Sequence, residues 1–279
     1  MPPDTDWHQY MIEFADPTSA AHIAACHLAP ALNKAQDADL LHTWWYIRKA
    51  PGWRLRYQPE NHGTTVIDDL LAKLIADGYI TDWTRGIYEP ETVVFGGPAA
   101  MRIAHDLFHH DSRHLLTSTA EHSPVLGQRE TTVLLFSALL RAAGLDRYEQ
   151  GDVWTKVLDL RPTAHAYVLA TEQSARLAQA IQRLITVNPR SVPGLLPEPW
   201  VAAFETAGHA LADLTRSGRL ERGLRAVLAH HFIFHANRVG LPTTDQSTLA
   251  ALAVDTVFHT VERTDSSGHP TRHHEGPTT

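Results

Sequence analysis

The sequence predicts an α+β domain, in which an N-terminal ferredoxin-like (βαββαβ) mixed sheet is covered by a large C-terminal helical layer. Three observations predict this fold. Strand and helix periodicities follow one another as β-α-β-β-α-β over residues 1–95, and an apolar period of about 3.6 residues continues over residues 96–262. The hydrophobic content of 43% is that of an ordinary globular protein. We expect one domain over residues 1–262 and a polar, disordered tail over residues 263–279.

The first strand and the first helix are predicted from the N-terminal residues. Residues 7–14 (WHQYMIEF) alternate as a strand does, and residues 15–32 have a helical apolar period, with Asp16 or Ser19 as candidate N-cap. Cys26 lies in this helix, and we expect it to be packed, as free cysteines often are. It is the only cysteine, which excludes an internal disulfide and a cysteine-based zinc cluster within the chain.

Turn residues and amphipathic patterns predict the rest of the sheet-rich half. Pro and Gly mark a hairpin turn, and a Gly can terminate the second helix. The expected elements are a strand over residues 41–49, a turn at Pro51-Gly52, a strand over residues 53–59, a helix over residues 64–78 ending at Gly78, and a strand over residues 79–90.

The helical half is predicted from segments that carry the helical apolar period, several of which end in glycine. Gly96-Gly97-Pro98 gives a sharp turn into the first of them, with proline in the first helical turn. A Pro-rich connection over residues 188–199 interrupts this half. The segments are residues 96–116, 127–144, 165–185, 198–218, 219–240 and 244–262.

Bulk composition narrows the function classes. The formal net charge of −7 and the sequence pI of about 6.2 argue against a protein that mainly binds nucleic acid. No apolar run is long enough to span a membrane, and the N-terminus lacks a secretory pattern, so we expect no membrane association and a cytoplasmic location.

A concentration of cations between aromatic residues is the first candidate site. The stretch WWYIRKAPGWRLRYQP, residues 44–59, carries Arg48, Lys49, Arg54 and Arg56. In a hairpin, Arg54 and Arg56 point to one face of the sheet and can cradle carboxylate, phosphate or peptide carbonyl groups. An exposed sheet face with solvated arginines is the alternative.

Histidine-rich helices are the second candidate. His105 and His109 share a helix face at the i, i+4 spacing of metal ligands, but no third ligand is apparent, so we expect a surface helix that carries histidines and no metal. Near the end of another apolar helix, His235 is followed by Asn237 and Arg238. Polar side chains in an apolar helix need partners, which makes this helix a candidate site, with a satisfied core histidine as the alternative.

These segments together resemble a known family. WHQYMIEF, WWYIRKAPGWRLRYQP, YEPETVVFGGPAAMRIAHDLFHHDS and HHFIFHANRVGL follow in the order seen in the thiopeptide-type bacteriocin biosynthesis domain, the C-terminal glutamate-eliminating domain of class I lanthipeptide dehydratases. The resemblance covers nearly the whole chain up to the tail. It implies an enzyme acting on a ribosomally made precursor peptide, without an organic cofactor or a metal.

The resemblance implies two competing activities. One eliminates glutamate from glutamylated Ser or Thr, and Arg54 and Arg56 match the arginines that would bind the glutamyl carboxylate. The other joins two dehydroalanines into a pyridine by a formal aza-[4+2] cycloaddition, with loss of water and leader peptide. Elimination domains carry a further arginine where this sequence has Val94, and a histidine where it has Ile233. These departures favour the pyridine synthase.

The site residues follow from this reading. The expected catalytic residues are His235, Tyr88, Arg54 and Arg56, with His235 or Tyr88 as general acid. The expected substrate-binding residues are Arg48, Trp44, Tyr46, Glu91, Asn237 and Arg238.

The leading hypothesis is therefore a thiopeptide pyridine synthase that macrocyclises a leader-bearing peptide rich in azoles and dehydroalanines. Its arginine-lined sheet face and last polar helix are expected to enclose a shared groove. The alternatives are the glutamate-elimination partner of a split dehydratase and a non-catalytic scaffold that binds the precursor peptide. Other enzymes of the pathway are possible partners.

Overall fold

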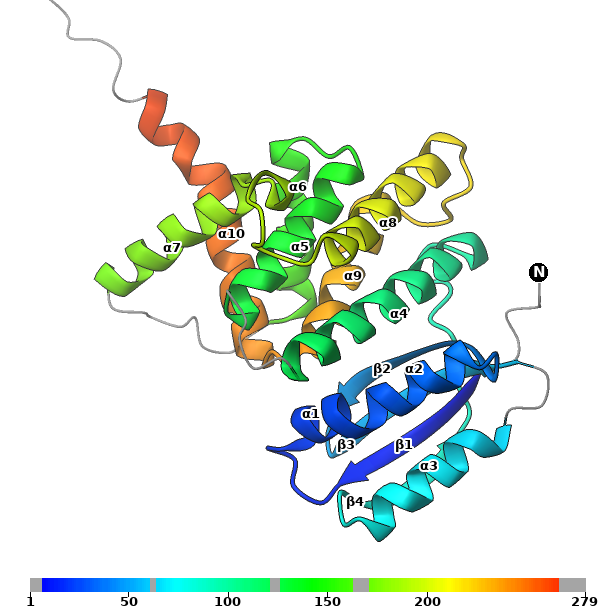
Figure 1. Ribbon diagram of the computed structural model, residues 1–279. Coiled ribbons are helices and arrows are strands. Elements are labelled where there is room, and N and C mark those ends of the chain that lie inside the picture. Colours follow the sequence, from blue (N-terminus) through cyan, green and yellow to red (C-terminus); the bar gives the residue numbers. More distant parts are fainter. Residues whose placement is uncertain (1–6, 61–63, 121–125, 163–170, 266–279) are drawn as a thin grey trace, which may run out of the picture.

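A four-stranded sheet and a larger body of helices make up the fold (Figure 1). The computed structural model describes residues 7–60, 64–120, 126–162 and 171–265. The strands have the order β2-β3-β1-β4, which is the ferredoxin-like order, and every described pairing is antiparallel. The prediction of a mixed sheet was therefore wrong, because the described sheet is antiparallel throughout. The parallel strands β1 and β2 are not neighbours because β3 is inserted between them. The strands are β1 (His8–Phe14), β2 (Leu41–Lys49), β3 (Gly52–Pro59) and β4 (Ile80–Gly86).

The fourth strand is shorter than predicted. β4 ends at Gly86, and residues 87–97 form a connection that leads to the helical half. Gly96 and Gly97 both have positive φ, 89° and 99°, which side chains with a Cβ rarely adopt. The sharp turn expected before Pro98 is therefore confirmed.

Helices from the N-terminal half cover one face of the sheet (Figure 1). The first predicted helix contains one π-helical turn, Ala24–Leu28, between α1 (Ala20–Ile23) and α2 (Ala29–Asp37). α3 (Thr64–Ala76) lies beside them. The buried strand residues on this face include Tyr10, Trp44, Tyr46 and Trp53. This face forms the first of three hydrophobic cores among the described residues.

Two local predictions in this region need correction. Cys26 is exposed, so it is not packed in the core, because it falls on the outer side of the π-helical turn. Asp16 and Ser19 do not cap α1 through their side chains. The Asp16 carboxylate instead accepts hydrogen bonds from the amide and hydroxyl of Thr18, an Asx turn ahead of the helix.

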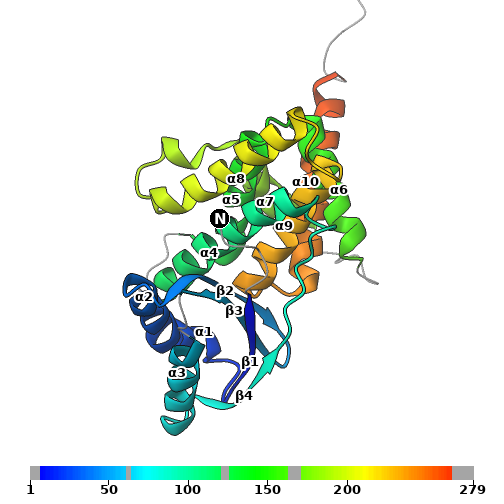
Figure 2. The same cartoon turned by 90° about the vertical axis from the view of Figure 1, so that its right-hand side faces the viewer.

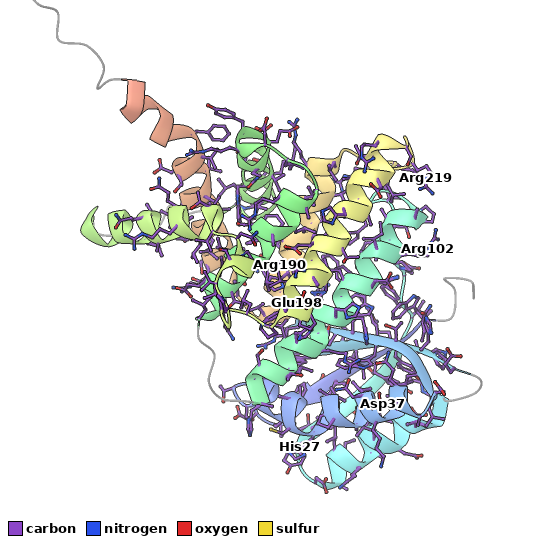
Figure 3. The ribbon with its side chains drawn as sticks, turned by 45° about the horizontal axis from the view of Figure 1, so that its top comes forward. His27, Asp37, Arg102, Arg190, Glu198 and Arg219 are labelled. Carbon is purple, nitrogen blue, oxygen red and sulfur yellow. The ribbon has the colours of Figure 1, made fainter. Side chains whose placement is uncertain are left out.

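The helical half forms the second core and packs against β2, rather than lying flat across the sheet (Figures 1 and 2). Its helices are α4 (Pro98–Ala120), α5 (Gln128–Ala142), α6 (Arg147–Leu160), α7 (Thr171–Thr186), α8 (Glu198–Arg216), α9 (Leu224–Val239) and α10 (Thr243–Asp265). A short 3₁₀ turn, Pro189–Ser191, lies in the Pro-rich connection. Arg190 from this turn pairs with Glu198 and Glu205, which ties the connection to α8 (Figure 3).

Two segments predicted for the helical half lie partly outside the described residues. α10 extends through Asp265, so residues 263–265 are helical and not part of a tail. Residues 266–279 of the predicted tail and residues 165–170 of a predicted helix lie outside the described residues.

Side chains of α4 and α9 close the outer edge of β2. His109 Nδ1 lies 2.8 Å from the Trp44 carbonyl oxygen, and Ser112 Oγ accepts from the Tyr46 amide at 3.2 Å. Arg238 Nε donates to the Tyr46 carbonyl at 3.2 Å. An edge strand normally exposes such groups, and here they are satisfied by helices distant in sequence.

The second face of the sheet is partly open (Figure 2). At the β2 end Trp45 and Ile47 are buried under α4 and α9. Toward β4 the face becomes accessible, and Met11 is 43% exposed. We call this second side the open face. The predicted placement of Arg54 and Arg56 on one face is confirmed, since both lie here in register with β1.

Candidate active site

Arg56 lies at the boundary between the buried and accessible parts of the open face. Its side chain is 3% exposed, and its Nε donates to Gln9 Oε1 at 2.8 Å. Its guanidinium carbon lies 4.4 Å from the ring centroid of Trp45 and 4.1 Å from that of Tyr88. Its Nη1 has no hydrogen-bond partner among the described residues. Arg56 is therefore a buried cation held by an amide and two aromatic rings, with one nitrogen left for another acceptor.

Tyr88 brings a hydroxyl group to this cation. The hydroxyl lies 2.9 Å from Nε2 of His105, and both side chains are buried, at 8% and 4% exposure. The half-buried Trp7 packs on the His105 ring at 4.4 Å between centroids and meets Tyr88 edge-on at 5.8 Å. A tyrosine bonded to histidine beside a guanidinium can act as a proton-transfer pair, because each group can exchange a proton with the other.

Glu91 adds a negative charge beside Arg56. Burial lowers the pKa of Arg56, and the neighbouring Tyr88 and Glu91 act in the opposite direction. The Oε2 atom of Glu91 is buried and has no hydrogen-bond partner among the described residues. The connection that carries Glu91 is anchored to the helical half, because Arg222 donates to the Val94 carbonyl at 2.8 Å. We call Arg56, Tyr88, Glu91 and His105 the Arg56 cluster.

A second polar cluster joins α4, α5, α8 and α9 inside the helical core. Asp111 Oδ2 lies 2.8 Å from both His235 Nδ1 and Arg238 Nη1, and Asp111 Oδ1 accepts from Trp200 Nε1 at 2.9 Å. His235 Nε2 lies 3.2 Å from the Thr132 hydroxyl. We call these residues the Asp111 cluster.

The charges of the Asp111 cluster compensate one another. Burial alone would raise the pKa of Asp111, but His235 and Arg238 outweigh it and hold that pKa below its usual value. Burial lowers the pKa of Arg238, and Asp111 opposes this change. A carboxylate with three partners binds the helices together, which is a structural role.

The sequence matches the model of the lantibiotic biosynthesis dehydratase C-terminal domain over residues 7–257. The chain belongs to this family. The assignment agrees with the family resemblance found in the sequence motifs, which is thereby confirmed. Among curated proteins no sequence matches.

Solved structures of this kind of domain share the fold. The tRNA-dependent lantibiotic dehydratase MibB from Microbispora sp. 107891 has a TM-score of 0.66 and 17% identity, over 95% of this chain and 29% of that chain. The pyridine synthase TbtD from thiomuracin biosynthesis has a TM-score of 0.65 and 14% identity, over 92% and 99%. TsrL has a TM-score of 0.60 and 15% identity, over 92% and 95%. The family domain thus spans less than a third of MibB and nearly all of TbtD.

The structure brings several predicted site residues of this dehydratase-family domain together. Arg56, Tyr88 and Glu91 share one cluster, and the half-buried Arg54 lies beside Arg56 on the open face. These residues come from β3 and from the connection after β4. Their catalytic and binding roles remain predictions.

Other predicted residues lie elsewhere. His235 is 2% exposed with both ring nitrogens near hydrogen-bond partners, and Arg238 is 1% exposed, so neither faces the arginines across a shared groove. They connect to the Arg56 cluster through the Trp45 ring, which lies 5.9 Å from Arg238. Asn237 accepts from Gln246 at 2.9 Å. The arrangement favours positioning roles for all three.

The residues predicted to bind flat substrates from β2 point to the covered side of the sheet. Trp44 and Tyr46 are 0% and 1% exposed, and Tyr46 stacks on Trp53 at 4.6 Å. Arg48 lies over the same Trp53 ring at 4.8 Å. Successive residues of a strand alternate between faces, so Trp45, and not its neighbours, reaches the Arg56 cluster. This placement favours packing roles for Trp44 and Tyr46.

Sequence reasoning missed His105, Gln9 and Asp111. His105 and His109 are buried, so the prediction of a surface helix carrying them was wrong. Their helix is wedged between the sheet and α8, which buries the face on which they lie. The i, i+4 spacing was the available signal, but it pointed to a metal. Among the described residues, no three His, Cys, Asp or Glu side chains gather as a metal site would require, and no helix has the length and apolarity of a membrane span.

Proposed function

We propose that this protein is a thiopeptide pyridine synthase, with the Arg56 cluster as its active site. The observation that carries the proposal is the composition of that cluster, in which a buried guanidinium with a free Nη1 is flanked by aromatic rings and by Glu91. Such a site suits a flat, uncharged peptide with carbonyl acceptors.

The charge of Glu91 favours one of the two family activities, pyridine formation. A glutamyl carboxylate approaching Arg56 would meet the Glu91 carboxylate, whereas a neutral dehydropeptide would not. Two further positions support the same choice. Val94 packs with the aromatic side chains of this region, and Ile233 is 6% exposed, so neither contributes a polar group where elimination domains carry one.

The proposed chemistry uses the cluster as follows. Arg56 Nη1 donates to the amide oxygen ahead of one dehydroalanine and stabilises its imidic-acid tautomer. The C=C–N=C unit so formed adds across the second alkene, making two ring bonds. Loss of water from the carbinol carbon and loss of the leader as a carboxamide then give the pyridine, without oxidation or reduction. The Tyr88 hydroxyl, bonded to His105, donates a proton to the departing hydroxyl and takes up the ring proton lost in that elimination. It then donates to the departing amide nitrogen and is restored by the ring proton lost in the second elimination.

Most of the acceleration in this scheme comes from positioning. Holding the two alkenes in a near-attack arrangement can supply about 7–11 kcal/mol. The half-buried Trp7, which meets Tyr88 edge-on, offers a ring surface for an azole next to the reacting residues.

Incubation with a defined peptide tests the proposal. The purified protein is given a leader-bearing peptide with azoles and two dehydroalanines, and mass spectrometry follows the products. We expect a pyridine macrocycle and a leader ending in carboxamide, and we expect Arg56→Lys to lose at least about 100-fold in rate, since a lysine lacks the planar fork. The exposed Arg102 on α4, changed to Lys, is the matched control (Figure 3).

Two other outcomes would overturn the proposal. Release of glutamate from a glutamylated peptide, with the dehydroalanine peptide untouched, would identify an elimination domain. Tight binding of both peptides without turnover by folded protein would identify a scaffold that presents the precursor to other enzymes.

A further inference from the structure

The two edges of the sheet are treated differently. The outer edge of β2 is closed by His109, Ser112 and Arg238. At the other side of the sheet, β4 has β1 as its strand neighbour and no second strand within the described residues. An open edge carries unpaired amides and carbonyls that can pair with another chain.

The register shows which groups of β4 point outward. In an antiparallel sheet, the amide and carbonyl of one residue point to one neighbouring strand, and those of the next residue to the other. The backbone amide and carbonyl of Tyr46 point outward from β2, so those of Trp45 point to β3, where Trp45 is paired with Arg56. The backbone groups of Arg56 therefore point to β2 and away from β1. Gln9 lies opposite Arg56 on β1, so its backbone groups point to β4, where it is paired with Gly86.

By the same alternation, the backbone groups of Arg85 and Trp83 point away from the sheet. The Trp83 amide fits this assignment, because it donates to the Asp82 carboxylate at 2.8 Å and not to β1. The amide of Arg85 and the carbonyls of both residues have no hydrogen-bond partner among the described residues. The Arg85 side chain is occupied separately, by Asp68 of α3.

We propose that the outer edge of β4 binds an extended segment of the peptide substrate by strand addition. The segment is the leader, ahead of the reacting core. This inference rests on the proposed function for the nature of the occupant, and it assigns backbone pairing as the mode of recognition.

Continuity with the Arg56 cluster argues for this occupant. β4 ends at Gly86 and the next residues carry Tyr88 and Glu91, so a chain leaving the edge at this end arrives at the cluster. Ile87 and Val93 flank these two residues and are 87% and 84% exposed, which provides apolar contacts along the route.

Sheet dimensions set the spacing that the peptide must have. A strand added beyond β4 lies three strand spacings from β3, or about 14 Å from the strand that carries Arg56. An extended chain covers this in about four to five residues. Because the leader precedes the core, and the cluster lies at the carboxyl end of β4, the docked leader runs parallel to β4.

A proline at an outward-facing position tests the pairing. Arg85→Pro removes the outward amide without removing a hydrogen bond to β1, and Arg85→Ala removes the same side chain but keeps the amide. The probe is the fluorescein-labelled leader segment of the synthetic leader-bearing peptide used to test the proposed function. We expect fluorescence anisotropy to give a Kd for Arg85→Pro about five- to tenfold above that for Arg85→Ala. Equal Kd values in two folded variants would overturn the inference.

A measurement on the unaltered protein covers the case in which Arg85→Pro fails to fold. Saturation with the same leader peptide should slow amide hydrogen exchange within residues 80–86, and unchanged exchange there would overturn the inference. A dimer in sedimentation that Arg85→Pro abolishes, with peptide binding unchanged, would also overturn it, since the edge would then pair with a second copy.

The inference and the proposed function fail separately. Leader binding that depends on the Arg85 amide, without pyridine formation, would retain the docking edge and reject the activity. Pyridine formation with equal leader binding by the two Arg85 variants would do the reverse.

Discussion

Two buried arginines lie against the same tryptophan and have different partners. Arg238 is bonded to the Asp111 carboxylate, whereas Arg56 is bonded to the neutral amide of Gln9. Their guanidinium carbons lie 5.9 Å and 4.4 Å from the Trp45 ring. The charge of Arg238 is thus compensated by direct contact, while that of Arg56 is held by aromatic faces and lies near the accessible part of the open face.

This difference in partners indicates that Arg238 belongs to a structural ion pair, whereas Arg56 is a cation able to bind a ligand. Removing one partner of a buried pair leaves an uncompensated charge, so the Asp111 cluster is expected to control stability. Both clusters keep unsatisfied atoms among the described residues. Arg238 Nη2 lies inside the helical core, whereas Arg56 Nη1 and Glu91 Oε2 lie near the accessible part of the open face, where a ligand can satisfy them. The Arg56 cluster is expected to control activity.

The largest expected effect comes from breaking the Asp111 cluster. Asp111→Ala leaves Arg238 buried without its carboxylate and should lower the free energy of unfolding by about 3–5 kcal/mol. Urea denaturation measures this change. Asp159→Ala, an exposed position on α6, should stay within about 0.5 kcal/mol. A similar small value for Asp111→Ala would show that the cluster does not hold the helices together.

Tyr88→Phe tests the Arg56 cluster and should change activity while leaving stability unchanged. It removes the hydroxyl bonded to His105 but keeps the ring under Arg56, so the fold should persist and kcat for pyridine formation should fall about 100-fold, or about 2.7 kcal/mol. Steady-state assays and circular dichroism check both parts. Tyr79→Phe, a ring stacked on His27, provides the control. Unchanged kcat in Tyr88→Phe would remove Tyr88 as proton donor.

Acid should weaken the contact between the sheet and α4. Burial lowers the pKa of His109 to about 4, while an unfolded chain has a histidine pKa of about 6.5. Between these values the unfolded state binds more protons, so the free energy of unfolding falls as the pH is lowered, by about 2 kcal/mol for this residue. Denaturation at pH 7, 5.5 and 4.5 measures the slope.

The variant His109→Asn should reduce that slope, since asparagine can donate to the Trp44 carbonyl without titrating. The buried His231 maintains the remaining part. The exposed His8, changed to Asn, should leave the slope as it is. An identical pH dependence of the free energy of unfolding in the two variants would show that His109 does not contribute to the slope.

The smallest expected effect is a gain in stability on replacing His231. His231 is 2% exposed, neither ring nitrogen has a hydrogen-bond partner among the described residues, and burial lowers its pKa to about 3. Its ring lies 5.0 Å from that of Phe95. Replacing it by leucine should raise the free energy of unfolding by about 1 kcal/mol at pH 7, because an unsatisfied polar group is removed.

His230→Leu is the matched variant for this test. His230 Nδ1 lies 2.9 Å from the Ala226 carbonyl oxygen, so its replacement should bring no gain. A loss of stability in His231→Leu would indicate that this imidazole is hydrogen-bonded in solution.

Sequence periodicity determined the ferredoxin-like order of strands and helices, the position of the hairpin and the face shared by Arg54 and Arg56. These features depend on local alternation and on turn residues, which neighbouring positions in the chain specify. The family was also recoverable from short motifs, because their order along the chain is itself sequence information.

The tertiary structure decided which polar residues meet. Tyr88 and His105, and Asp111 and His235, are brought together by the packing of α4 between the sheet and the other helices. Periodicity assigns a side chain to a face, but it does not state which distant element covers that face or how deeply. For this reason His235, expected in a groove shared with the arginines, is buried in the helical core, while the sheet has one closed edge and one open edge among the described residues.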